Sequence, residues 1–156
     1  MILFFGFLFM LFFFAVCIVA SKSNFMLINL PALVLILIPL FFFLFVSKSG
    51  KIIGKYISIS FKKNYTYTKT ELEKLSLAIK NTIKYTLAVG VFCFTAFTVT
   101  SLGFLGSPEL LGPNLAMCLL SLTYSIAIGF FVFFPAFAWA ENKLSNINNS
   151  DKSYSL

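Results

Sequence analysis

Hydroxyl side chains recur at helical spacing inside an otherwise apolar segment, residues 85–106. Thr95, Thr98 and Ser101 are three residues apart and therefore fall on one face of a helix. A hydroxyl does not store a proton at neutral pH, but it can position a water molecule or an ion. Because polar side chains in hydrocarbon turn toward other helices or a cavity, this face is predicted to border a polar seam.

The last apolar segment, residues 113–140, carries a second such stripe. Ser121, Ser125 and Gly129 are four apart, a spacing of small residues that lets another helix approach closely. The candidate ion-path residues of the two segments are Thr95, Thr98, Ser121 and Tyr124. An alternative stays open, in which these hydroxyls donate to carbonyls of their own helix and serve packing only.

Four apolar segments are long enough to place these side chains inside a bilayer. A hydrocarbon core about 30 Å thick needs about 20 apolar residues in a helix. The segments are residues 2–20, 29–46, 85–106 and 113–140, and none has a charge in its interior. The first two contain almost no hydroxyl, so they are predicted to face lipid while the last two face a wetter environment. The expected fold is all-α, a polytopic membrane protein with four transmembrane helices.

Composition and charge fit one membrane domain. Hydrophobic residues make up 60% of the 156 residues, which leaves little for a soluble core. The net charge of +7 comes from lysines, most of them between the second and third segments. Short lysine-rich loops stay in the cytoplasm, so both termini are predicted to be cytoplasmic, and nucleic acid is not an expected partner. The first segment is expected to be a retained span, because no lysine precedes it and it exceeds a signal's apolar core.

The residue types exclude several other functions. The chain has no histidine, and its three cysteines occur singly, so no metal site and no cofactor are expected. Glu109 and Glu141 are too far apart to form an acid/base pair, and no glycine-rich phosphate loop is present. The protein is therefore predicted not to be an enzyme.

Capping and breaking residues divide the chain. Thr70 and Glu73 form a capping box pattern that predicts one helix over 71–105, about 50 Å long at 1.5 Å per residue. It is expected to begin in the cytoplasm and continue as the third span.

Gly112-Pro113 is expected to open the last span, and Pro135 to kink it. The predicted divisions are residues 1–47 (helices one and two), 48–70 (a short basic cytoplasmic loop), 71–144 (the long helix plus helix four) and 145–156 (a disordered polar tail). Within the loop, an interfacial helix and a strand both stay open.

The last span resembles that of MotA-type flagellar stator proteins. The residues that carry the resemblance are Gly112-Pro-Asn-Leu-Ala-Met-Cys-Leu-Leu-Ser-Leu-Thr-Tyr-Ser, followed by Phe134-Pro135. Residues 25–36 are similar to the family's entry into span two, and residues 128–136 to TolQ and ExbB proteins. The chain thus looks like a short, divergent member of the MotA/TolQ/ExbB proton channel family.

The resemblance implies a homopentamer of four-span subunits in a bacterial inner membrane, around single-span MotB/TolR/ExbD-like partners that supply an ion-carrying aspartate. Ser121 and Tyr124 match the family's threonine and tyrosine, whereas Leu122 replaces its second threonine. The candidate helix-packing residues come from the family resemblance and from the small-residue stripe of the last segment. They are Ser125, Gly129, Pro135, Gly112 and Pro113. The expected function is a stator-type proton channel subunit that couples ion flow to mechanical work. The alternative is a non-conducting four-helix scaffold or accessory protein.

Overall fold

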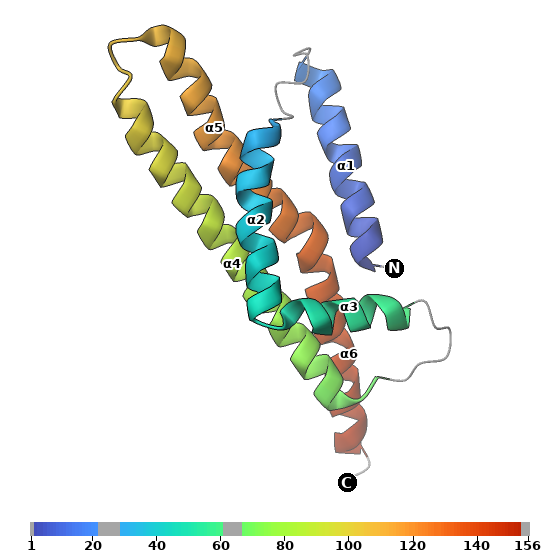
Figure 1. Cartoon of the computed structure of the whole chain (residues 1–156). Coiled ribbons are helices and arrows are strands. Elements are labelled where there is room, and N and C mark those ends of the chain that lie inside the picture. Colours follow the sequence, from blue (N-terminus) through green and yellow to red (C-terminus); the bar gives the residue numbers. More distant parts are fainter. Residues whose placement is uncertain (1, 22–28, 61–66, 154–156) are drawn as a thin grey trace.

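A computed structural model describes residues 2–21, 29–60 and 67–153, and each element in these ranges is helical. The elements are α1 (Ile2–Ser21), α2 (Leu30–Val46), α3 (Ser49–Ser60), α4 (Lys69–Leu102), α5 (Pro108–Ala127), the π-helix η1 (Ile128–Phe133) and α6 (Phe134–Ser153) (Figure 1). The predicted all-α class is confirmed for this part of the chain.

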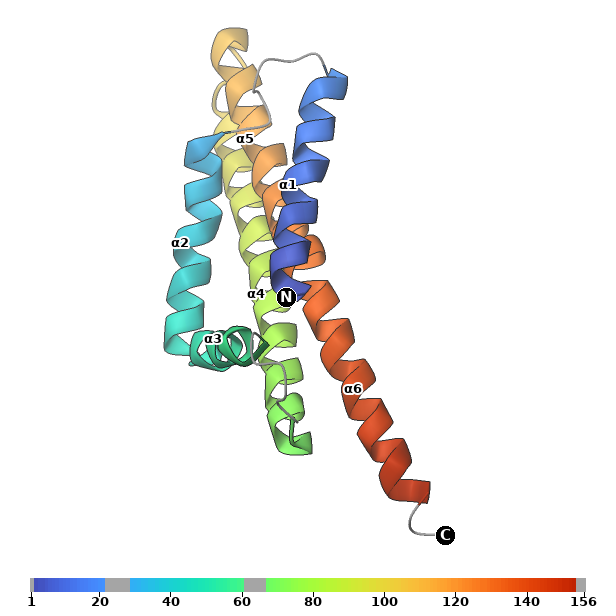
Figure 2. The ribbon, with the colours of Figure 1, turned by 90° about the vertical axis from the view of Figure 1, so that its right-hand side faces the viewer.

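Two long columns form the spine of the molecule. One is α4, and the other is the continuous run of α5, η1 and α6 (Figures 1 and 2). α2 packs on α4 and α5, whereas α1 packs on η1 and α6. α1 and α4 run in one direction, and α2 and the α5–α6 column run in the other. As a result, α3, the start of α4 and the end of α6 lie toward one end of the molecule.

The described residues contain two helices that are long and apolar enough to cross a membrane. They are Lys69–Leu102 and Glu109–Asn149. α2 and α3 are long and apolar enough only when they are taken together, and they are bent by 89° at their junction. Counting this pair as one span gives up to three candidate spans. The apolar stretch of α1, Phe4–Cys17, is shorter than a full span. The structure therefore supports a helical membrane protein with two to three candidate spans, where the sequence predicts four.

The long helix begins two residues earlier than the sequence predicts. Its N-cap is Thr68, whose amide donates to Glu71 Oε2 at 3.3 Å, so the capping box uses this pair and not Thr70 with Glu73. The physical reason is the same in both cases, since a carboxylate in the first turn satisfies an amide that has no helical partner. Gly103 caps the other end, and the 34-residue helix forms as one piece.

The basic loop predicted over 48–70 contains a helix. α3 turns sharply from α2 at Lys48, whose φ of 56° is in the left-handed region. Ser49 then donates its amide to Ser47 Oγ at 3.3 Å. The sequence left an interfacial helix and a strand open for this loop, and its described part forms the amphipathic helix. Ile53 and Tyr56 share one buried face of that helix at helical spacing.

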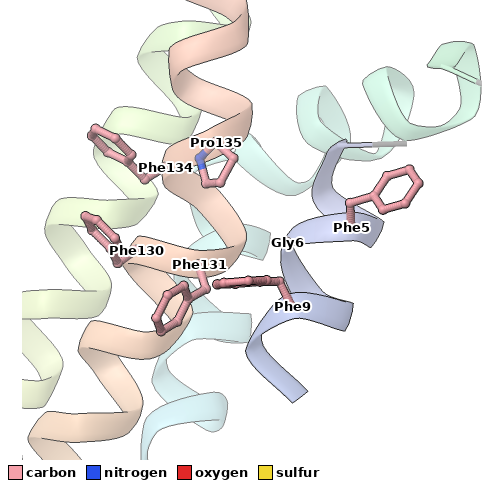
Figure 3. Close-up of a pocket in the computed structure, with 7 residues that line it drawn as sticks. All are labelled: Phe5, Gly6, Phe9, Phe130, Phe131, Phe134 and Pro135. Atoms are coloured by element: carbon pink, nitrogen blue, oxygen red, sulfur yellow. The ribbon is translucent and has the colours of Figure 1, made fainter. Parts of the chain in front are cut away.

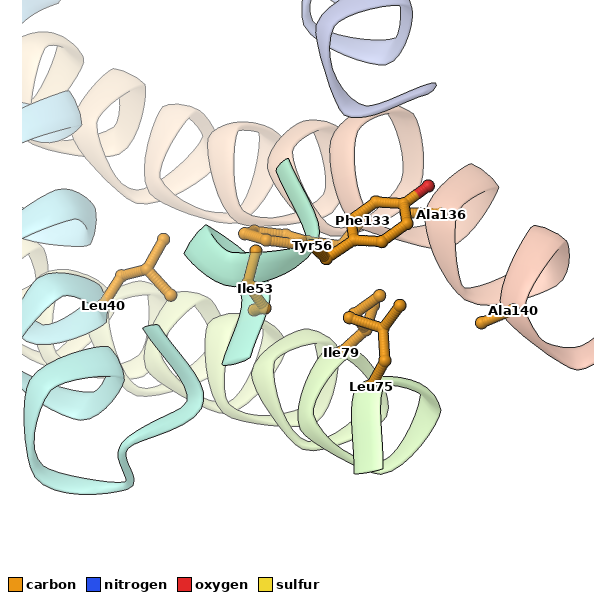
Figure 4. Packing of buried hydrophobic residues seen from close by; sticks show 8 residues of the cluster. All are labelled: Leu40, Ile53, Tyr56, Leu75, Ile79, Phe133, Ala136 and Ala140. Atoms are coloured by element: carbon orange, nitrogen blue, oxygen red, sulfur yellow. The ribbon is translucent and has the colours of Figure 1, made fainter. Parts of the chain in front are cut away.

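The buried face of α3 closes one end of the main apolar core (Figure 4). Tyr56 lies with its ring centroid 5.2 Å from that of Trp139, and Tyr67 lies 5.4 Å from Trp139. The core cluster consists of Leu40, Ile53, Tyr56, Leu75, Ile79, Phe133, Ala136 and Ala140. Outside this core, Lys55 Nζ pairs with Glu71 Oε1 at 2.9 Å and links α3 to the first turn of α4.

Two predicted boundaries near the end of the chain are wrong. α5 begins at Pro108 after the N-cap Ser107, so Pro113 lies inside the helix and does not open it. Because Leu110 and Leu111 donate their amides back to Ser107, the first turn is complete before Gly112. The polar residues from 145, predicted to be disordered, continue α6 as a helix through Ser153.

Removing the Tyr56 ring should loosen α3. We expect Tyr56→Ala to destabilise the fold by about 3–5 kcal/mol, the usual cost of removing a buried aromatic ring, and to expose Trp139, the single tryptophan. Trp139 fluorescence should then shift to longer wavelength and be quenched more readily by acrylamide. The matched control is Ile57→Ala on the exposed side of α3, which should leave the emission unchanged. An unchanged spectrum in Tyr56→Ala would contradict the packing of α3 on α6.

Candidate functional site: the α4–α5 helix pair

α4 and α5 approach each other closely at Gly90 and Ser125. A Cβ atom at Gly90 would overlap both Oγ and Cβ of Ser125 and would come within 3.5 Å of the Ser121 carbonyl oxygen. Only a glycine allows this contact, because any other residue would push the two backbones apart. The small-residue stripe of α5 therefore meets a matching glycine on α4.

Ser121 and Ser125 lie in this contact and have no exposed surface. Ser121 donates to the Cys118 carbonyl, and Ser125 donates to the Leu122 carbonyl, each at 2.8 Å. Their hydrogen-bonding need is thus met inside α5, as in the packing alternative that the sequence left open. Within the protomer these two hydroxyls lie in a buried helix contact.

Two buried threonines lie one and two helical turns before Gly90 on the same face of α4. Thr82 donates to the Ala78 carbonyl and Thr86 to the Thr82 carbonyl, both at 2.8 Å, and neither side chain is exposed. Farther along, Ser101 is buried beside Cys118, with 3.8 Å between Oγ and Sγ. The buried hydroxyls on this face of α4 are therefore satisfied within the protein.

Thr95 and Thr98 lie elsewhere on α4. Thr95 is exposed and donates to the Phe92 carbonyl at 2.8 Å, while Thr98 is half-buried and donates to the Phe94 carbonyl at 2.7 Å. Each keeps acceptor capacity on its oxygen, since a hydroxyl can accept as well as donate. Of the four candidate ion-path residues, Thr95 is the most exposed.

Tyr124 faces a third surface, toward α1 and α2. Its hydroxyl accepts the Asn29 amide at 2.8 Å, and its ring centroid is 5.9 Å from that of Phe14. Asn29 is also the N-cap of α2, where its side chain accepts the Ala32 amide at 3.2 Å. Tyr124 therefore ties the start of α2 to α5. The structure does not bring it together with Thr95 or Ser121.

The remaining packing candidates differ in how tightly they are enclosed. Gly129 is buried, but a Cβ there would meet Ile83 and Leu87 at 3.9 Å, an ordinary contact distance. Gly112 faces open space. Of the predicted small residues, Ser125 has the tightest surroundings, and the glycine that receives it, Gly90, was not among the sequence candidates. The sequence feature that could have identified Gly90 is that it is the one glycine between residues 55 and 102.

Pro135 shapes the helix just before it. Proline has no amide hydrogen, so the Phe131 carbonyl loses its usual helical donor. The helix widens into η1 immediately upstream, where the Phe134 amide reaches back to the Gly129 carbonyl. Where the sequence predicts a kink, the structure has a π-helical segment.

The widened segment is where α1 docks (Figure 3). A Cβ at Gly6 would overlap the Phe131 carbonyl oxygen, so the backbone of α1 approaches the group that Pro135 leaves without its usual donor. Phe9 lies beside Phe131 with 5.6 Å between ring centroids. Gly6, which sequence reasoning also missed, thus fixes the position of α1.

A carboxylate joins the two columns near the other end of the helix pair. Ser76 on α4 donates its hydroxyl to Oε1 of Glu141 on α6. No sequence pattern points to this hydrogen bond, because the two residues are 65 positions apart. Glu109, by contrast, is exposed in the first turn of α5.

Comparisons with protein-family models, with curated proteins and with solved structures gave no match. The resemblance to the MotA/TolQ/ExbB proteins therefore stays a prediction from the residues of the last span. Among the described residues, no group of histidine, cysteine, aspartate or glutamate side chains could hold a metal ion.

Gly90→Ala should force α4 and α5 apart. We expect a loss of about 1–3 kcal/mol in the free energy of unfolding, typical of an overpacked contact. Adding Ser125→Gly removes both overlapping atoms and should restore most of that free energy. The measurement is reversible unfolding in detergent, followed by helical circular dichroism.

The matched control is Gly112→Ala, a helical glycine that faces open space. It should keep or slightly raise stability, because alanine favours a helix more than glycine does. If Gly90→Ala were as stable as this control, the close α4–α5 contact would be disproved.

Proposed function

We propose that the protein is a subunit of a homo-oligomeric proton channel of the MotA/TolQ/ExbB type in a bacterial inner membrane. It would work with a single-span partner that carries the acid, and it would couple ion flow to mechanical work. The observation that carries the proposal is the uneven distribution of hydroxyls over the exposed helix surfaces.

The exposed side chains described on α1 and α2 are all apolar, mostly phenylalanine and leucine. α4 instead exposes Thr95 and Thr100 among its apolar residues. Both hydroxyls donate to carbonyls of α4, but each oxygen can also accept a hydrogen bond. Acyl chains offer no donor for it, whereas a wet path between subunits does. An assembly that turns α1 and α2 toward lipid and α4 toward its own centre satisfies both surfaces.

The proposed topology has four spans with cytoplasmic termini. The alternating directions of α1, α2, α4 and the α5–α6 column agree with it (Figure 2). The exposed Lys48, Lys51 and Lys55 all lie at the end of the molecule where α3 crosses. By the rule that lysine-rich segments remain inside, this end faces the cytoplasm.

The geometry narrows the proposed ion path to Thr95 and Thr98. Ser121 is enclosed behind α4, and Tyr124 is turned toward α1 and α2. The four described glutamates lie at 71, 73, 109 and 141, outside the apolar parts of the spans. A proton carrier within the membrane would therefore come from the partner, and Thr95 and Thr98 would hold water beside it.

A non-conducting scaffold is the second candidate. The observation that favours it is that the buried hydroxyls of Thr82, Thr86, Ser121 and Ser125 are satisfied by carbonyls of their own helices. In that case the small residues serve helix packing alone. The two functions differ in what the exposed threonines do, so they can be separated by measurement.

Thr95→Val keeps the shape of the side chain and removes its hydroxyl. In vesicles that contain the protein with its co-purified partner, we expect proton flux to fall about fivefold, the effect of removing a hydrogen bond of about 1 kcal/mol. Ser121→Ala and Thr123→Val are the controls, because Ser121 is enclosed and Thr123 borders a small apolar pocket against α1. Flux in the unmodified protein no greater than in empty vesicles would favour the scaffold, and equal flux in Thr95→Val and both controls would contradict the role of Thr95 in the path.

The mass of the purified complex provides an independent check. We expect native mass spectrometry to find five copies of the 17.5 kDa chain together with a smaller partner. A monomer in mild detergent, with no second protein, would contradict the channel proposal.

A further inference from the structure

A cavity of 640 Å³ separates α1 from α2 and reaches the α5–η1 column behind them. Its lining is apolar except for the hydroxyl of Tyr124, which already accepts the Asn29 amide. Phe7 and Phe14 line it from α1, and Leu37 and Leu44 line it from α2. Such a lining offers a water molecule few hydrogen-bond partners.

The cavity follows from how α1 and α2 are held. Gly6 brings α1 against η1, whereas α2 packs on α4 and α5. Neither helix therefore fills the space beside the other. In a bilayer such a space is occupied by hydrocarbon, and its length along α2, from Leu33 to Leu44, suits an extended chain more than a compact ligand.

Two exposed lysines, Lys48 and Lys51, form a basic corner at the bend between α2 and α3, at one end of this cavity. Leu44, the last lining residue of α2, is one helical turn before Lys48 at the bend into α3. Lys48 and Lys51 are both exposed there. The ion pair described in this region is that of Lys55 with Glu71, so within the described residues neither Lys48 nor Lys51 pairs with a carboxylate.

We propose that this cavity and corner together bind an anionic glycerophospholipid. One acyl chain occupies the apolar cavity, and the phosphate lies beside the ammonium groups of Lys48 and Lys51 at headgroup level. The charge at the corner selects the occupant, since a zwitterionic lipid offers the same chain but no net negative charge. The bound lipid would fill the space between α1 and α2 and hold α1 in place.

The experiment uses the full chain in nanodiscs of mixed phosphatidylglycerol and phosphatidylcholine. Lipids retained after gentle release into detergent are counted by native mass spectrometry. We expect retained phosphatidylglycerol to exceed phosphatidylcholine. The double variant Lys48→Gln/Lys51→Gln should reduce that preference by about fivefold for each lysine, as expected from about 1 kcal/mol per basic residue near an anionic surface.

Two further variants test the headgroup site and the acyl-chain site separately. Lys80→Gln/Lys84→Gln removes the same charge from exposed positions on α4 and should keep the preference. Ala15→Phe places a ring into the cavity from an exposed position on α1 and should lower retention of both lipids, with helical content unchanged. If the Lys48/Lys51 variant kept its preference, or showed no larger drop than the Lys80/Lys84 variant, the headgroup site would be disproved. Unchanged retention in Ala15→Phe would disprove the acyl-chain site.

Discussion

The close approach of α4 and α5 at Gly90 and Ser125 is the constraint on which the rest of the structure depends. Because Gly90 has no side chain, the Ser125 side chain lies against the backbone of α4, and the two longest columns come close together there. The hydroxyls of Ser121 and Ser125 find their acceptors within α5. α2 then packs on both columns. The same contact encloses Ser121 and leaves Thr95 outside, so it decides which hydroxyls can meet water.

A second constraint comes from Pro135. The proline removes a helical hydrogen bond, the chain widens into η1, and the Phe131 carbonyl becomes the docking point for Gly6 of α1. α1 is thereby held by η1 and α6, away from the α4–α5 contact. The apolar cavity beside α2 is a consequence of this placement. Lipid occupation and the position of α1 are therefore coupled in the proposed membrane state.

The function proposed for the chain depends on which surfaces remain polar after packing. Most hydroxyls in the last two apolar segments are used within the protomer, which by itself suits a scaffold as well as a channel. What distinguishes the channel is the exposed hydroxyl of Thr95 on the outer surface of α4. Since the described carboxylates lie outside the apolar parts of the spans, conduction would need an acid from a partner. The subunit would supply the walls of the path and not its proton carrier.

Local patterns predict much of this protein because helix formation depends on neighbours a few residues apart. The apolar length of α4 and a capping carboxylate in its first turn follow from the local pattern, although the carboxylate is Glu71 and not Glu73, and the helix ends at Leu102 and not at residue 105. The shifts to Thr68 and Pro108 are small, since several polar residues or prolines near a helix start can cap or open it.

The sequence alone also determined that hydroxyls cluster in the last two apolar segments. Only the tertiary structure decided that Ser121, Tyr124 and Thr95 face three different surfaces, that Gly90 and Gly6 are the contact points, and that Ser76 meets Glu141. Such contacts join residues far apart in the chain, and their distances depend on how whole helices cross, which no local spacing contains.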